Sequence, residues 1–230
     1  MKKEIESIIR QIADLLMVNG SFLLNPGLFY GDMGLVLFFT RYARYTQNEL
    51  YLDYSYDLMG KIQKSINRES PINYVNGLAG IGSAIEYLVQ NGFFAANTDE
   101  ILEDIDRQVF FTYNLLNLSI DKIMDIGYYA AWRMSGNSTQ KDAIQRTILP
   151  QIEKIMHDHS VVPAWHQLCR KTISDSFAGK TYSHCLELIA KNNFWGNEIG
   201  FQNGLAGWGL SLLTELDGDD SWISLLISED

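Results

Sequence analysis

The sequence predicts an all-α protein whose helical hairpins form an α/α toroid, and three observations support this fold class. A short GxxG motif recurs three times, and a helix-length run of mostly apolar residues follows each copy. Charged segments with a helical apolar stripe alternate with these runs, and no segment shows the sustained apolar–polar alternation of a strand. A helix that is apolar on all sides must be surrounded by protein, so apolar inner helices and amphipathic outer helices predict a toroid. The motif glycines are Gly31, Gly34, Gly77, Gly80, Gly204 and Gly207.

The first amphipathic helix is expected over residues 5–16, where isoleucine and leucine recur at helical spacing. Asn19-Gly20 predicts a left-handed cap at its end. Inner apolar helices are expected after the motif copies, with residues 35–39, 81–88 and 208–213 as their first apolar runs. Further amphipathic helices are expected over residues 50–67, 99–117, 139–157 and 174–192, with Thr98 as the N-cap of the third segment.

The motif spacing predicts five repeats in a single domain over residues 1–230. Gly31 and Gly77 are 46 residues apart, and a further step of that length falls close to Gly127, where Gly-Tyr-Tyr-Ala reads as a decayed copy. A fourth copy near His166 has lost its glycines, and Gly204 opens the fifth. Five hairpins would form either a compact closed ring or an incomplete one. An open ring would expose an apolar edge for a partner or a second copy, unless the aromatic segment 221–227 fills the gap.

Composition limits the classes of partner and location. The chain has 230 residues and a net charge of −10, which argues against nucleic-acid partners because phosphate backbones would be repelled. Two cysteines do not make a disulfide framework, so a reducing, cytoplasmic location is expected. No apolar run approaches ~18 residues, so no membrane span is expected. Glu4, Glu6 and Asp14 interrupt the apolar stretch that a signal peptide would need.

The motif glycines are first expected to serve packing and turn geometry, because glycine permits close backbone approach. The loops that carry them would also ring the mouth of the toroid, where helix N-termini favour anions and polar ligands. A phosphate-binding loop is not expected, because no Gly-Lys-Ser/Thr follows any copy.

Three blocks carry a family resemblance: Gly27-Leu-Phe-Tyr-Gly-Asp-Met-Gly34, Asn76-Gly-Leu-Ala-Gly-Ile-Gly82 and Asn203-Gly-Leu-Ala-Gly-Trp-Gly209. With these blocks the chain resembles the lanthionine synthetase C-like family. The resemblance implies an α/α toroid, and in members that cyclise lanthipeptides it implies a zinc ion held by two cysteines and a histidine. That zinc activates a peptide cysteine thiolate, which adds to a dehydrated serine or threonine while a histidine and an aspartate assist with protons.

The positions that match those reactive residues hold other side chains here. Gln202 and Asn203 stand where the resemblance implies a zinc-binding Cys-His pair, and His166 follows Trp165 where it implies the other cysteine. Asn73 stands at the aspartate position, and the middle block around Tyr128 lacks the histidine. We therefore expect no zinc, no catalysis, and binding of a peptide or partner enzyme at a mouth lined by Asn73, Tyr128, His166, Gln202 and Asn203.

Two alternatives stay open at this point. The chain could be a metal-dependent peptide cyclase with an altered zinc site at His166, Cys169 and Cys185, with His184 nearby, or another enzyme of the toroid class, including a glycan-acting one. Other candidate groups have simpler interpretations: Glu103, Asp104 and Asp106 as a solvated helix face, His157 and His159 as complements to a helix dipole, and Trp132, Trp165, Trp195 and Trp208 as core.

Overall fold

The computed structural model describes residues 2–159 and 199–226. These residues form helices joined by loops and contain no strand, which confirms the all-α prediction. They divide into two compact units, one of Met1–Ile66 with Cys169–Asp230 and one of Asn67–Leu168. We call these unit 1 and unit 2 and describe each by itself. The single-domain prediction stays a prediction.

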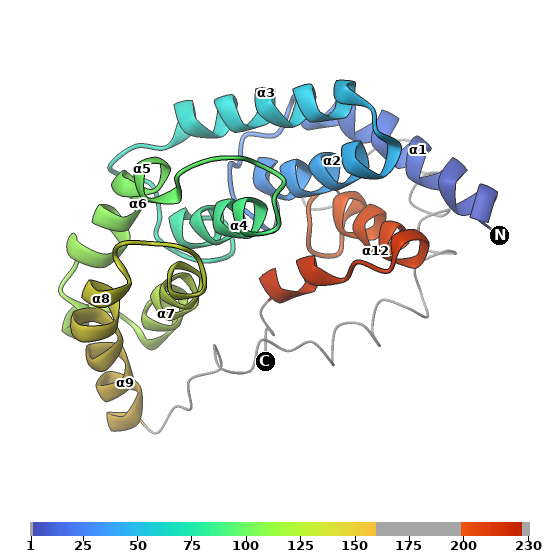
Figure 1. The fold of residues 1–230 in the computed structure, drawn as a ribbon. Helices are drawn as coiled ribbons and strands as arrows, with labels where there is room; N and C mark the ends of the chain where they lie inside the picture. The colour runs from blue at the N-terminus through green and yellow to red at the C-terminus, as the bar shows by residue number, and fades with distance from the viewer. Residues whose placement is uncertain (1, 160–198, 227–230) are drawn as a thin grey trace. The chain divides into compact units, whose positions relative to one another are not determined.

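In the described part of unit 1, the two apolar motif helices α2 and α12 are largely buried, and the amphipathic helices α1 and α3 pack against them. Residues 32–43 of α2 are all buried. This helix packs against both α3 and α12, and α12 also packs against α1 (Figure 1). The amphipathic helices α1 and α3 present charged faces to solvent, as outer helices of a toroid would. The elements of unit 1 are α1 (Lys2–Gly20), α2 (Asp32–Thr46), α3 (Glu49–Ser65), α12 (Leu205–Asp217) and the 3-10 helix η6 (Ser221–Leu225).

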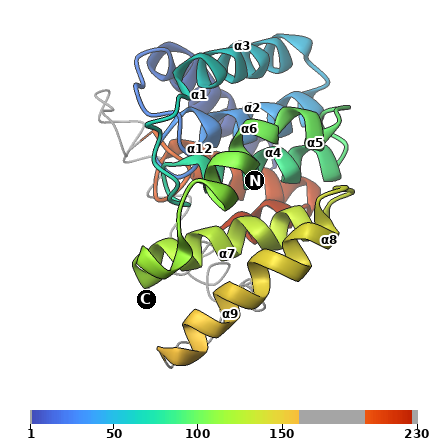
Figure 2. The same cartoon turned by 90° about the vertical axis from the view of Figure 1, so that its left-hand side faces the viewer.

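Unit 2 repeats this plan around the packed pair α4 and α7. Nearly every residue of α4 is buried, and α7 also runs beside α9 (Figure 2). Short helices before α7 take the outer position. The elements of unit 2 are α4 (Leu78–Gln90), α5 (Thr98–Ile101), α6 (Glu103–Asp106), the π-helix η1 (Arg107–Phe111), the 3-10 helix η2 (Leu115–Asn117), α7 (Ile120–Ser135), α8 (Lys141–Ala143), the π-helix η3 (Ile144–Ile148) and α9 (Leu149–Asp158).

The three clear motif copies begin helices where the sequence predicts them. Gly31, Gly77 and Gly204 are the N-cap residues of α2, α4 and α12, and each has an extended backbone with no side-chain cap. The outer helix predicted over residues 50–67 is also confirmed, as α3.

Three local predictions are wrong. Gly127 does not begin a helix, because it lies in the middle of α7, which starts after Ser119. Gly20 has no left-handed backbone; it is the last residue of α1, and a Cβ there would collide with the Leu35 side chain. The helix predicted over residues 99–117 is broken into four short pieces, and its N-cap is Asn97.

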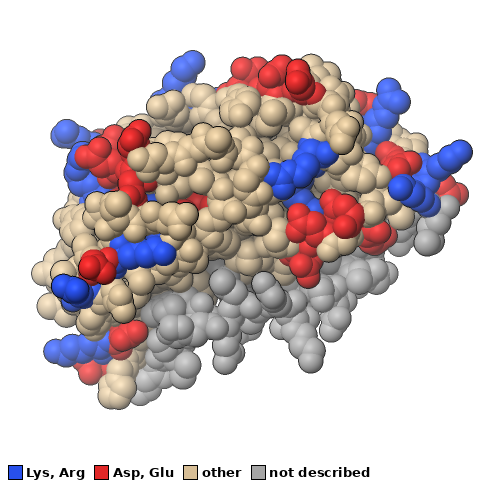
Figure 3. Space-filling view, viewed as in Figure 1, with Lys and Arg blue, Asp and Glu red and all other residues tan. Residues whose placement is uncertain are grey.

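Several predicted features lie outside the described residues. These are the helix over residues 174–192 and the side chains of Trp165, His166, Cys169, His184, Cys185 and Trp195. Within the described part of the chain, no helix is long and apolar enough to cross a membrane. On the face shown in Figure 3, acidic and basic side chains lie in neighbouring groups and form no continuous acidic field.

Candidate functional site

The loop before each motif helix folds back on itself, and the first glycine makes this possible. The N–H of Asp32 donates to the Asn25 carbonyl at 2.9 Å, and the N–H of Leu78 donates to the Pro71 carbonyl at 2.8 Å. Each accepting carbonyl belongs to the residue six positions before the motif glycine. A Cβ on Gly31 or Gly77 would collide with that same carbonyl oxygen. The repeated glycine thus gives two loops of unlike sequence the same backbone closure.

In unit 1, the loops before α2 and α12 lie side by side. The N–H groups of Phe201 and Gln202 both donate to the Phe29 carbonyl, at 2.7 and 3.1 Å, and the rings of Phe29 and Phe201 meet edge to face. Gly34 lies against this contact, because a Cβ there would be 2.7 Å from the Cβ of Phe201. The motif positions therefore bring residues 29 and 201, far apart in sequence, into direct contact.

Gln202 and Asn203 occupy different environments in the loop before α12. Asn203 is exposed and has a left-handed backbone with a φ of 55°. Gln202 is half-buried, and its Oε1 is enclosed without a hydrogen-bond partner in the described part of the chain. An enclosed amide oxygen of this kind is costly unless a donor reaches it, so it marks a place where a bound group could donate.

In unit 2, the loop before α4 is held by Asn73 and contacts α7. The Asn73 side-chain oxygen accepts from the Asn76 N–H at 2.8 Å, so this amide closes its own turn. Tyr128 is 6% exposed and packs its ring against Tyr74, with centroids 5.5 Å apart. The buried Tyr128 ring on α7 therefore packs against the loop before α4 through Tyr74. Two of the predicted mouth residues, Asn73 and Tyr128, lie in unit 2, where Tyr74, the residue after Asn73, contacts Tyr128. Two others, Gln202 and Asn203, are adjacent in the chain and lie in unit 1.

Asp125 is a carboxyl group near this loop that the sequence analysis did not select. It lies on α7, three residues before Tyr128, and accepts a hydrogen bond from the Tyr74 N–H. Burial raises the pKa of Asp125 to about 6, and the Tyr74 hydrogen bond only partly offsets this. The signal in the sequence was weak, because an aspartate one turn after Asp121 reads as part of a charged helix face.

The described residues do not fit the zinc ion that the resemblance implies for cyclising members. The matched positions 202 and 203 offer two neutral carboxamides, which are poor zinc donors compared with a thiolate and an imidazole. Among residues 2–159 and 199–226, no three His, Cys, Asp or Glu side chains form a group that could hold a metal ion. The alternative ligands His166, Cys169 and Cys185 lie outside those residues.

A buried ionic cluster surrounds Arg133 in the described part of unit 2, and the sequence analysis missed it. Arg133 on α7 is fully buried, and its guanidinium donates to Glu86 of α4, Asp99 of α5 and Asp106 of α6. The Asp99 and Asp106 contacts are each 2.7 Å. Asp106 also accepts from the Tyr129 hydroxyl at 2.5 Å. The cluster therefore ties three short stretches of chain to α7.

This cluster corrects the interpretation of Asp106 as part of a solvated face, because Asp106 is 7% exposed whereas its neighbours Glu103 and Asp104 are exposed. Burial raises the pKa of Asp106, and the hydrogen bonds from Arg133 and Tyr129 act against it without cancelling it. Burial also acts to raise the pKa of Asp99, but hydrogen bonds from Ser138, Thr139 and Arg133 outweigh it and hold this pKa below its usual value.

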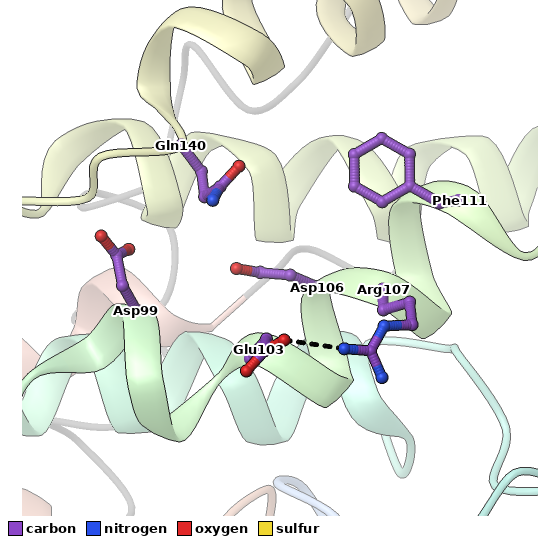
Figure 4. A pocket seen from close by; sticks show the side chains of 6 residues that line it. All are labelled: Asp99, Glu103, Asp106, Arg107, Phe111 and Gln140. Atoms are coloured by element: carbon purple, nitrogen blue, oxygen red, sulfur yellow. Dashed lines mark hydrogen bonds and ion pairs between the residues drawn. The ribbon is translucent and has the colours of Figure 1, made fainter.

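A hollow of about 170 Å³ opens beside the cluster, on the outer helices of unit 2. Figure 4 shows Gln140 facing Asp99 and Asp106 from the opposite side, with Phe111 at the end nearest Arg107. Glu103 lies at its edge and pairs with Arg107 at 2.7 Å. Asp99 and Asp106 both accept hydrogen bonds from the same guanidinium, that of Arg133.

Comparison with known families gives one result. A family model described as lanthionine synthetase C-like protein matches residues 2–122, which is more than half of the chain. The matched stretch contains the first two motif copies, the loop with Asn73 and the short helices that carry Asp99 and Asp106. No curated protein and no solved structure gave a match.

Proposed function

Because this chain belongs to the lanthionine synthetase C-like family, we propose that it is a non-catalytic member that binds a peptide or a partner enzyme in peptide maturation. The observation that carries the proposal is a contrast within the motif loops. The glycines that close the loops before α2 and α4 are kept, while the positions matched to reactive groups hold the amides Asn73, Gln202 and Asn203. The loop framework is retained, and the acid, thiolate and imidazole are replaced.

The replacing side chains are suited to binding a peptide backbone. A carboxamide offers both a donor and an acceptor, as a peptide group does. In unit 1, the enclosed Oε1 of Gln202 accepts no hydrogen bond from residues 2–159 or 199–226, and the exposed Asn203 follows it directly in the chain. In unit 2, Asn73 holds the loop before α4, and the buried rings of Tyr74 and Tyr128 support that loop. Each loop by itself therefore carries at least one carboxamide side chain beside a motif glycine.

The direct test of the non-catalytic part is a cyclisation assay. Purified protein would be incubated with zinc and a peptide that carries one cysteine and one dehydroalanine. Thiol addition leaves the peptide mass unchanged, so the remaining free thiol would be measured by alkylation and mass spectrometry. We expect the same thiol loss as in zinc buffer alone. Thiol loss that rises with protein concentration would overturn the proposal.

The binding part is tested with the same peptide by calorimetry, using two variants at left-handed positions. Asn203→Gly removes the side chain without straining a backbone whose φ is 55°. Gln47→Gly does the same at an exposed position with a φ of 53°, at the end of α2. We expect Asn203→Gly to weaken binding by about three- to tenfold, the loss of one hydrogen bond, and Gln47→Gly to leave it unchanged. Equal affinities for both variants would remove Asn203 from the site.

A further inference from the structure

The hollow on the outer helices of unit 2 is lined by acidic side chains and by one aromatic side chain. Asp99, Glu103 and Asp106 line one part of it, and Phe111 forms another. Phe111 is 61% exposed, which is unusual for a phenylalanine, and it opens a short run of exposed apolar side chains that continues with Tyr113 and Leu116, the latter 78% exposed. The hollow therefore combines acidic side chains with one exposed aromatic ring.

The acidic part is held in place before any ligand arrives. Asp99 is fixed by Arg133, Ser138 and Thr139, and Asp106 by Arg133 and Tyr129. These bonds fix the carboxylates but do not neutralise them, because one guanidinium serves three acids. The residues that line the hollow, together with Glu86 and Arg133 of the supporting cluster, carry four carboxylates and two guanidinium groups, a net charge of −2: Glu86, Asp99, Glu103 and Asp106 against Arg107 and Arg133.

Two groups that face the hollow remain available to a ligand. The side-chain amide of Gln140 is exposed and makes no hydrogen bond to the described residues. The Phe111 ring packs edge to face on Phe110 and leaves most of its surface to solvent. An aromatic ring next to fixed negative charge is a favourable place for an organic cation, which interacts with the ring and with the carboxylates at once.

We propose that this hollow binds the cationic side chain of a basic peptide segment, with apolar neighbours of that side chain covering Phe111 and Leu116. The volume of about 170 Å³ suits one extended side chain and not a whole peptide. The negative charge of the hollow favours a basic segment because opposite charges attract. The exposed apolar side chains Phe111, Tyr113 and Leu116 favour a segment in which the basic residue has apolar neighbours. None of the residues that line the hollow belongs to a motif loop, so this proposal can be tested independently of the function proposed above.

The test uses the full chain and the peptide acetyl-Leu-Arg-Leu-amide, with affinity measured by NMR titration. Matched peptides replace the arginine by glutamate, or both leucines by serine. We expect the arginine peptide to bind and the glutamate peptide not to bind. The serine peptide should bind at least about threefold more weakly. Raising sodium chloride from about 0.05 to about 0.5 M should weaken the arginine peptide, because surface charges are screened.

Four surface variants locate the site. Phe111→Ser and Glu103→Gln should each weaken the arginine peptide by about threefold or more. Phe22→Ser, at a 76% exposed phenylalanine in unit 1, and Glu153→Gln, at an exposed acid on α9, are the matched controls and should not change it. All four residues are exposed, so circular dichroism should confirm unchanged folding. Equal binding of the glutamate peptide, or unchanged affinity in both Phe111→Ser and Glu103→Gln, would overturn the proposal.

Discussion

Replacing Arg133 with methionine should destabilise the protein strongly at neutral pH. Methionine fills a similar volume but leaves Glu86, which is fully buried, and Asp106, which is 7% exposed, as buried carboxylates without a cation. Breaking a buried pair by removing one partner costs about 3–5 kcal/mol, because the remaining charge is not solvated. That loss is a large part of the ~5–15 kcal/mol that stabilises a typical domain.

Arg107→Met provides the control, because it removes the same charge from the surface. Arg107 is 63% exposed and pairs with Glu103 and Asp104, which are also exposed. Exposed pairs contribute at most about 1 kcal/mol, so this variant should unfold at nearly the wild-type urea concentration. Urea denaturation followed by circular dichroism would measure both variants at about pH 7.5 and about pH 4.5.

The pH dependence separates a charge effect from a packing effect. In the Arg133→Met variant the orphaned carboxylates can take up protons, so its deficit relative to the wild type should shrink as the pH falls to about 4.5. A deficit caused by imperfect packing of the methionine would not change with pH. The reasoning is refuted if Arg133→Met loses less than about 1 kcal/mol at neutral pH, or if its loss is the same at both pH values.

Two further predictions concern unit 1 and the motif glycines. Burial raises the pKa of Asp32 to about 6 despite its pairing with Lys61, so the folded state holds this proton more tightly than the unfolded state. The contribution of Asp32 to the free energy of unfolding is therefore fully present below about pH 4 and is lost as the pH rises through about 6, by at most about 3 kcal/mol. In the Asp32→Asn variant, the melting temperature should depend less on pH between these values. Gly77→Ala should cost about 1–3 kcal/mol, because its Cβ would meet the Pro71 carbonyl oxygen. Gly60 lies on α3 and has no atom near the position of a new Cβ, so Gly60→Ala should instead stabilise the protein by about 0.5–1 kcal/mol. Similar melting temperatures for the two alanine variants would contradict the role of Gly77 in closing the loop before α4.

The helices of the motif could be predicted from the sequence because their signals are local. A glycine before an apolar run marks both the turn and the enclosed helix, and α2, α4 and α12 begin where this signal places them. Residues 99–117 gave a misleading local signal. Their charge pattern is that of a solvated helix, but Asp99 and Asp106 turn inward to Arg133, and the chain breaks into short helices around these contacts. The break in this helix depends on Arg133, which is more than 25 positions away in the sequence. Helical periodicity describes only residues a few positions apart, so it could not predict the break.

A sequence signal for the Arg133 cluster did exist, and it lies in the enclosed helices themselves. Glu86 is the only charged residue of α4, and Arg133 follows the apolar run Tyr-Tyr-Ala-Ala-Trp on α7. A charge on an enclosed helix has to be paired, because the interior does not solvate it. The two residues are 47 positions apart in the sequence and lie on the packed helices α4 and α7, where they form an ion pair. Arg41, buried on α2, follows the same logic and pairs with Asp217 at the end of α12. In a helical repeat, isolated charges on the apolar helices therefore predict contacts between neighbouring repeats.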